Sequence, residues 1–552
     1  MPRTKSLALP LAVLLAGTAS AAMARPAAVA APAISVETLK EVTQTLSSDA
    51  FEGRAPTTPA EDKTVAYIAD RFAKAGLKPG NKGGWYQNVP LAEITTKPDV
   101  TLNVTGGKAP LSFAYKQDMV VKTYQIQPRI DIANADIVFV GYGINAPERG
   151  WNDYAGIDVR GKVVIILVND PDWQTQTLDG PFGGRAMTYY GRWTYKYEEA
   201  ARQGAAAALI VHDTEPAAYG FNVVVSSNTG PQLELDAADG HMDQSKAIGW
   251  LTNDAARRLL AAAGQDLDTL SAAAKVKGFK AVPLGLKASM TLENAIRRQA
   301  SKNVVGLLPG RTRPDEYIVY SAHWDHLGRC EPVSGDDICN GALDNASGIA
   351  GLVALADAYR TQGAPERSVL FVAVTAEESG LLGSQYYATN PVEPLAKTVA
   401  GLNMDGLNVL GRTHDVVVIG PGKSELEDNL KRAVLAQNRM IVPEPTPEKG
   451  SFYRSDHFSL AKVGVPTLYF DSGEDLLDGG KAAGRAAAED YVKNRYHAPS
   501  DEYDPKWNWS GAVEDLQLYY RIGRELADGS AWPNWYPTAE FRATRDQSRG
   551  TK

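Results

Sequence analysis

The sequence of 552 residues has little cysteine and no strongly basic stretch. Its two cysteines, Cys330 and Cys339, exclude a small scaffold held together by many disulfide bonds. The formal net charge is −8, and no basic segment is interleaved with aromatic residues, so we expect no nucleic-acid partner. Beyond the N-terminal region no apolar run is long enough to span a membrane. The composition, 44% hydrophobic and 22% charged, is that of a globular protein.

The N-terminal region has the features of an export signal. Arg3 and Lys5 precede the apolar run "LALPLAVLLAGTAS", which small residues follow. This run is shorter than the roughly 20 apolar residues that a spanning helix needs, so a cleaved signal peptide is favoured over an anchor. We expect residues 1–24 to be removed, which leaves a periplasmic or secreted protein with no membrane attachment.

A chain of this length predicts more than one domain. Residues 34–117 begin with two segments of helical periodicity, and residues 118–290 are dominated by short β-rich runs between glycine, proline and aspartate turns. Strands and helices alternate in residues 291–530, and residues 531–552 resemble a loosely held tail. The alternation predicts an α/β fold, a three-layer αβα domain with a mainly parallel mixed sheet, into which the β-rich segment is inserted.

Periodicity also places the elements of the third region. The predicted strands are residues 316–322, 367–376, 397–404 and 465–470, and the predicted helices are residues 345–360, 381–390, 424–438 and 511–528. Ligands of open α/β sheets bind outside the carboxyl ends of the strands, so polar residues at those ends should lie together. Such residues, with two from neighbouring loops, are His323, Asp325, Asp344, Glu377, Glu378, Asp405 and His497.

Two histidines with several carboxylates, and no cysteine, suit zinc or another first-row divalent ion. One catalytic zinc needs only three protein ligands. Five candidates are available here, which are His323, Asp344, Asp405, His497 and one of the adjacent pair Glu377 and Glu378. Five ligands suit two ions if one carboxylate is shared, and Asp344 is the expected bridge because it has two oxygens.

The adjacent glutamates predict two different roles. Neighbouring residues that leave a strand point in different directions, so one can bind metal while the other acts as general base, and spacing alone does not assign them. Asp325, two residues after His323, is the expected acceptor for the second N–H of that imidazole. Taken singly, a carboxylate at a strand end is usually a solvated charge or a helix cap.

The ordered motifs "AHWDH", "GALDNASG", "AEESGLLGS", "NMDG", "SDHFSLAKVGVPTLYF" and "YHAPSDEYD" resemble those of the co-catalytic di-zinc exopeptidases, which include secreted bacterial aminopeptidases and glutamate carboxypeptidases. The resemblance covers essentially the whole mature chain, and the insert is similar to a protease-associated domain. It implies two zinc ions per chain. One would be held by His323, Asp344 and Asp405, and the other by Asp344, Glu378 and His497.

The same resemblance implies roles for the remaining residues. Glu377 becomes the general base, supported by Asp325, and His326 becomes a structural residue of its loop. Tyr453 resembles a tyrosine that lies near the substrate carbonyl in relatives, where it could stabilise the oxyanion.

The expected function is that of an exported aminopeptidase acting on peptides. A carboxypeptidase or dipeptidase is the alternative, and it would need a cation such as Arg454 for the terminal carboxylate. Glutaminyl cyclases share the fold but use a single zinc. A catalytically inactive binding module would lack ligands, whereas every ligand position is filled here. The sequence indicates no oligomeric state.

The cysteines flank the short loop "EPVSGDDI", which lies between His323 and Asp344. An oxidising compartment favours a disulfide between them, with free thiols as the alternative. If oxidised, the pair is expected to fix this loop at the rim of the site.

Overall fold

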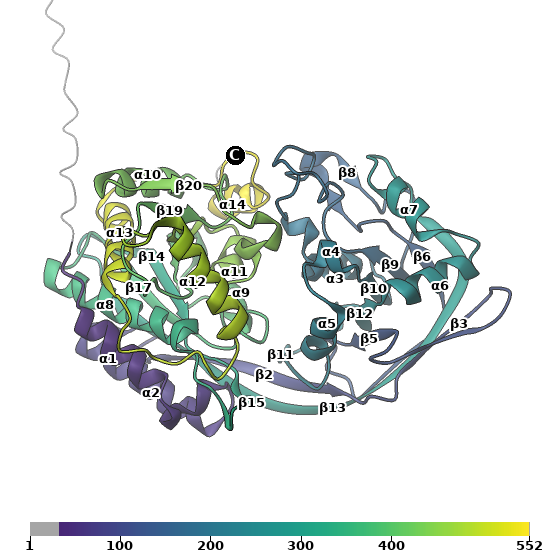
Figure 1. The fold of residues 1–552 in the computed structure, drawn as a ribbon, viewed down its shortest axis with the longest axis horizontal. Coiled ribbons are helices and arrows are strands. Elements are labelled where there is room, and N and C mark those ends of the chain that lie inside the picture. The colour runs from purple at the N-terminus through teal and green to yellow at the C-terminus, as the bar shows by residue number, and fades with distance from the viewer. Residues whose placement is uncertain (1–31, 551–552) are drawn as a thin grey trace, which may run out of the picture.

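The computed structural model describes residues 32–550, so the predicted signal peptide lies outside the described residues. Two lobes lie side by side, each with its own apolar core (Figure 1). The core of the first lobe takes residues from Ile34 to Leu77 and from Val304 to Ala527, and that of the second takes residues from Val100 to Leu292. Among the described helices, none combines the length and apolar character needed to cross a membrane.

A mixed sheet forms the centre of the first lobe. Its strand order is β11-β2-β13-β17-β14-β18-β21-β19-β20. The central strands β17, β14, β18 and β21 are parallel, whereas β13, β2 and β11 join antiparallel. The strands are β2 (Tyr86–Thr96), β11 (Pro231–Leu235), β13 (Val282–Leu308), β14 (Arg313–His323), β17 (Arg367–Val374), β18 (Thr398–Asn403), β19 (Asp415–Val418), β20 (Met440–Val442) and β21 (Thr467–Ser472). The predicted mainly parallel mixed sheet is confirmed.

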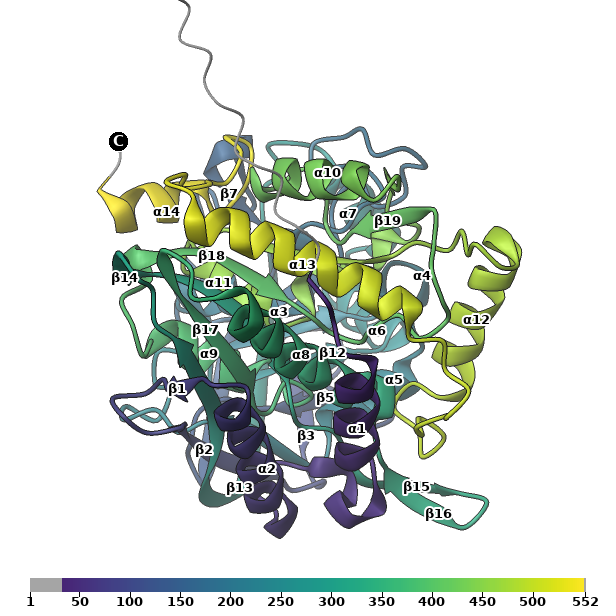
Figure 2. The same ribbon diagram turned by 90° about the vertical axis from the view of Figure 1, so that its left-hand side faces the viewer.

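Helices cover both faces of this sheet, as the alternating side chains of β14 illustrate. Ile318 and Tyr320 enter a core shared with α1, α2, α8, α10 and α13, whereas Tyr317 and Val319 face α9 and α11. Figure 2 shows α8 and α13 running across one face. The helices are α1 (Val36–Leu46), α2 (Pro59–Lys74), α8 (Ser347–Gln362), α9 (Leu382–Thr389), α10 (Leu426–Ala436), α11 (His457–Lys462), α12 (Gly480–Asn494) and α13 (Ser510–Asp528). The first lobe is therefore a three-layer αβα domain.

The second lobe has its own sheet, and β13 is part of both sheets. Its strand order is β4-β3-β13-β6-β9-β10-β12-β5, in which β6, β9, β10 and β12 are parallel. The strands are β3 (Thr101–Thr105), β4 (Leu111–Ala114), β5 (Met119–Lys122), β6 (Arg129–Phe139), β9 (Val163–Leu167), β10 (Ala207–Val211) and β12 (Ala247–Leu251). The helices include α3 (Trp193–Arg202), α5 (Phe221–Asn228), α6 (Asn253–Ala262) and α7 (Leu267–Ala274), so the insert contains more helix than its sequence indicated.

The residues after 530 pack against the first lobe. Trp535 is fully buried, and its indole N–H donates to the carbonyl oxygen of Gly464 at 2.9 Å. In α14 (Arg542–Arg549), buried Arg545 donates to the carbonyl oxygen of Thr398 at 2.7 Å. The expectation of a loosely held tail was wrong, because this segment supplies its own core residues.

Cys330 and Cys339 form a disulfide that links β15 (Gly328–Val333) to β16 (Asp336–Cys339), as expected for an oxidised pair. The β15–β16 hairpin projects from the body of the molecule (Figure 2). No residue between 328 and 342 lines the main cavity. The expected position of this loop at the rim of the site was therefore wrong.

The packing of Trp535 can be tested by unfolding in urea. Trp535→Ala is expected to lower the free energy of unfolding by about 3–5 kcal/mol, because it leaves a large cavity and an unpaired Gly464 carbonyl. The control is Leu435→Ala, whose side chain is 62% exposed and whose effect should stay within about 0.5 kcal/mol. Equally small changes in both variants would show that the C-terminal segment is loosely held.

Candidate metal centre

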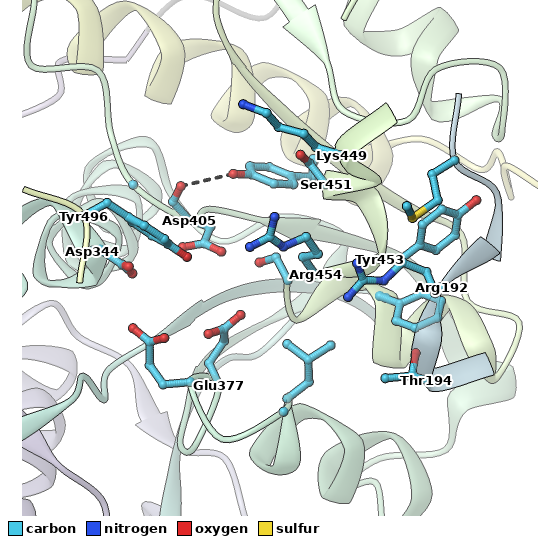
Figure 3. A pocket seen from close by; sticks show the side chains of 18 of the residues that line it. Arg192, Thr194, Asp344, Glu377, Asp405, Lys449, Ser451, Tyr453, Arg454 and Tyr496 are labelled. Atoms are coloured by element: carbon cyan, nitrogen blue, oxygen red, sulfur yellow. Dashed lines mark hydrogen bonds between the residues drawn. The ribbon is translucent and has the colours of Figure 1, made fainter. Parts of the chain in front are cut away.

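The polar residues at the strand ends converge on one cavity of about 2560 Å³ that both lobes line. His323 ends β14, Glu377 and Glu378 follow β17, and Asp405 follows β18. Because these strands are parallel and adjacent, their carboxyl ends meet at one edge of the sheet. In Figure 3, Asp344, Glu377 and Asp405 surround a common space.

Asp344 stands between the two predicted metal sites. His323 Nε2 lies 3.2 Å from Asp344 Oδ1 and 3.1 Å from Asp405 Oδ1. The other oxygen of Asp344 lies 3.3 Å from His497 Nε2, which is 3.0 Å from Glu378 Oε2. The structure thus brings together all five predicted ligands, with Asp344 contacting each histidine through a different oxygen.

His326 also enters this cluster, which sequence reasoning missed. It is buried, and its Nδ1 lies 2.7 Å from Glu378 Oε1. Within residues 32–550, two groups have possible ligand atoms within 4.8 Å of one another, which are His323 with Asp344 and Asp405, and His326 with Asp344 and Glu378. The available signal was the second histidine of "AHWDH", which we had expected to be only structural.

Several buried side-chain atoms of the cluster that could bind a metal ion have no hydrogen-bond partner. These atoms are Glu378 Oε1, His497 Nε2 and both ring nitrogens of His326. His326 Nδ1 and Glu378 Oε1 approach closely, yet their orientation is not that of a hydrogen bond. Leaving such groups unpaired in the interior costs free energy, whereas a cation would satisfy their converging lone pairs. The residues present therefore fit metal ions.

The electrostatics of the cluster also favour cations. Burial opposes the charge of His497, but Asp344 and Glu378 raise its pKa to about 10. Burial likewise opposes ionisation of Asp344, yet the neighbouring imidazoles of His323 and His497 hold its pKa well below the usual range. Both shifts show that the surrounding carboxylates attract positive charge.

Glu377 lies beside the two groups of candidate metal ligands and belongs to neither. Burial raises its pKa well above the ordinary value, and the charges of Asp405 and Glu378 raise it further, although His323 acts in the opposite direction. A carboxylate with high proton affinity next to a metal site suits proton transfer.

Asp325 supports the site through the backbone. Its carboxylate accepts the N–H of Glu377 at 3.1 Å and that of Glu378 at 3.4 Å, which fixes the turn after β17. His323 Nδ1 lies 3.1 Å from the backbone oxygen of Asp325 and 3.8 Å from its carboxylate. The expected carboxylate partner of this imidazole is thus replaced by a carbonyl.

Two further buried residues hold the loops that carry the ligands. The guanidinium of Arg54 donates to the carbonyl oxygens of Leu46, Trp324, Asn340 and Gly341. The Asp501 carboxylate accepts the N–H groups of Leu343 and Asp344. The backbone on both sides of the cluster is therefore fixed by charged hydrogen bonds.

The structure does not support the role expected for Tyr453. Its hydroxyl accepts from Lys423 Nζ at 2.8 Å and donates to Glu540 Oε1 at 2.9 Å. Tyr496, which sequence reasoning missed, stacks on His497 with ring centroids 3.8 Å apart. Figure 3 shows its hydroxyl reaching into the cavity near Asp344. The signal for Tyr496 was its position directly before His497.

Residues 303–521 match the family model Peptidase family M28. This segment belongs to peptidase family M28. Both groups of candidate ligands lie within the M28 segment, as do Glu377 and Tyr496.

Individual relatives match parts of the chain. Aminopeptidase NAALADL1 of Mus musculus is 32% identical over 127 residues, which are 22% of this chain and 16% of the relative. Probable leucine aminopeptidase 1 of Trichophyton verrucosum is 30% identical over 191 residues, which are 32% of this chain and 50% of the relative. These relatives are matched over half their length or less. Among solved structures, the aminopeptidase from Aneurinibacillus sp. strain AM-1 is 20% identical, with a TM-score of 0.48 over 90% of this chain and 94% of that one.

Measuring the amount of bound metal tests whether Asp344 is a ligand of both ions. After loading with zinc and removal of excess metal, the wild-type protein is expected to hold two ions per chain. Asp405→Ala and Glu378→Ala should each reduce this by about one, whereas Asp344→Ala should reduce it most because both sites lose a ligand. The control is Asp490→Ala, an exposed residue of α12. Equal losses from all three ligand variants, measured by elemental mass spectrometry, would contradict a shared ligand.

Proposed function

We propose that the protein is a zinc-dependent aminopeptidase that releases N-terminal residues from peptides with the help of two metal ions. The observation that carries this proposal is Asp344, whose oxygens contact two separate histidine and carboxylate groups beside the free carboxyl group of Glu377. The two relatives described above are named aminopeptidases, which supports release from the N-terminus. Zinc suits these nitrogen and oxygen ligands.

Metal ions held by His323, Asp344, Asp405, Glu378 and His497 would supply Lewis-acid chemistry, which polarises a scissile carbonyl and makes a bound water more acidic. Glu377 takes a proton from that water at its carboxylate and delivers it to the leaving amine. Asp325 keeps Glu377 in place through the backbone N–H. The hydroxyl of Tyr496, which reaches into the cavity near Asp344 (Figure 3), can donate to the oxygen of the scissile carbonyl.

An exported location is part of the proposal. It rests on the signal-like residues 1–24 and is supported by the Cys330–Cys339 disulfide, which suits an oxidising compartment. We also propose that the second lobe acts as a protease-associated domain.

The direction of cleavage is tested by product mass spectrometry. One unblocked peptide is incubated with zinc-loaded protein beside its N-acetylated and C-amidated forms. We expect residues to leave one at a time from the N-terminus, and acetylation to stop release because the free amine is needed for docking. Release from the C-terminus that amidation abolishes would replace the aminopeptidase by a carboxypeptidase.

The role of Glu377 is tested separately. Glu377→Gln is expected to lower kcat by at least about a hundredfold, because the amide cannot accept the proton of the attacking water. Metal content should remain that of the wild-type protein. The matched control Glu489→Gln, on the exposed face of α12, should leave kcat unchanged. Loss of metal from Glu377→Gln would show that Glu377 is a ligand rather than the base.

A further inference from the structure

Two arginines from different lobes reach into the cavity next to the candidate metal centre. Arg192 directly precedes α3 in the second lobe, and Arg454 lies in the loop before α11 in the first. In Figure 3 both guanidinium groups extend into the same space, with Arg454 between Arg192 and the acidic residues Asp405 and Glu377. Burial lowers the pKa of Arg192 to about 10, and the charge of Arg454 contributes to that shift.

Neither guanidinium has a hydrogen bond or an ion pair with another residue of the described range 32–550, and Arg192 Nε is buried without a partner. Two other cations that line the same cavity are paired, whereas Lys449 and Lys506 have no ion pair within residues 32–550. Lys462 Nζ lies 2.7 Å from Glu198, and Arg202 Nε lies 2.7 Å from Glu199. Two unpaired like charges facing one space repel each other, and an anion between them would remove that cost.

We propose that Arg192 and Arg454 bind a carboxylate of the peptide substrate on the side of the scissile bond that leaves. This inference rests on the proposed aminopeptidase function, since a peptide bound by its amine at the metal centre extends its remaining residues into the cavity. Planar guanidinium groups match carboxylates through paired N–H donors, which an ammonium group does not offer. The carboxylate is either the C-terminus of a short peptide or an acidic side chain near the cleaved bond.

This arrangement gives the second lobe a part in substrate choice. Arg454 belongs to the M28 segment, whereas Arg192 is supplied by the inserted lobe across the cavity. Only a substrate whose carboxylate reaches both residues gains the full interaction, so the second lobe selects peptides by charge as well as by length.

The test compares kcat/KM for three substrates of the zinc-loaded enzyme, which are leucyl-alanine, leucyl-alanine amide and leucyl-glutamic acid α-amide. We expect leucyl-alanine to be cleaved at least about tenfold faster than its amide, since hydrogen bonds between ions contribute at least that factor. In Arg192→Gln this ratio should fall toward one, and Arg192→Lys should retain part of it. Arg160→Gln, an exposed arginine of the same lobe that pairs with Asp158, should keep the wild-type ratio.

Using a ratio separates recognition from folding, because a poorly folded variant loses activity on all substrates alike. A preference for the glutamic acid amide over leucyl-alanine amide would support the inference and assign the carboxylate to a side chain. Equal cleavage of all three substrates by the wild-type enzyme would overturn the inference and leave the aminopeptidase in place. Cleavage of none would overturn the proposed function and this inference with it.

Discussion

The hydrogen bonds of Arg54 join the two segments that carry the candidate ligands. Its guanidinium reaches the carbonyl oxygen of Trp324, next to His323, and that of Gly341, three residues before Asp344. Burial lowers the pKa of Arg54 to about 10, while the carboxylates of the centre act to raise it. The dependence is therefore mutual. The arginine fixes the backbone from which the carboxylates project, and their charges keep the arginine protonated in the interior.

The sequence predicted the location of site residues correctly where they directly follow strands of a parallel sheet. Because β14, β17 and β18 are parallel neighbours, a residue directly after one strand must lie near those after the others, as His323, Glu378 and Asp405 do. No comparable rule predicts where the side chains of loop residues lie. The error at Tyr453 followed from the error about the C-terminal segment, since the hydroxyl is bound to Glu540, in a segment that we expected to be loosely held.

The same reasoning explains which elements could be predicted. Helix α13 buries one apolar face, so its periodicity is visible in the sequence, whereas α8 is buried on nearly all sides and is recognised by its continuous apolar run. Helix α12 buries only Gly484 and therefore has no apolar stripe to find. The length of β13 was hidden because its two halves contribute to different cores, and no local pattern indicates that one strand serves both.

β13 changes from one sheet to the other without a linker. Glu293 pairs with Arg129 of β6, and the next residue, Asn294, pairs with Thr96 of β2. The separation of the lobes is thus counted in strand residues, each of which adds about 3.3 Å and turns the following side chains to the opposite face. Each residue added to or removed from β13 would change the distance between the lobes by this fixed amount. Across related chains, the gap between the lobes would therefore change in discrete steps, and only even steps would preserve the faces on which both cores are built.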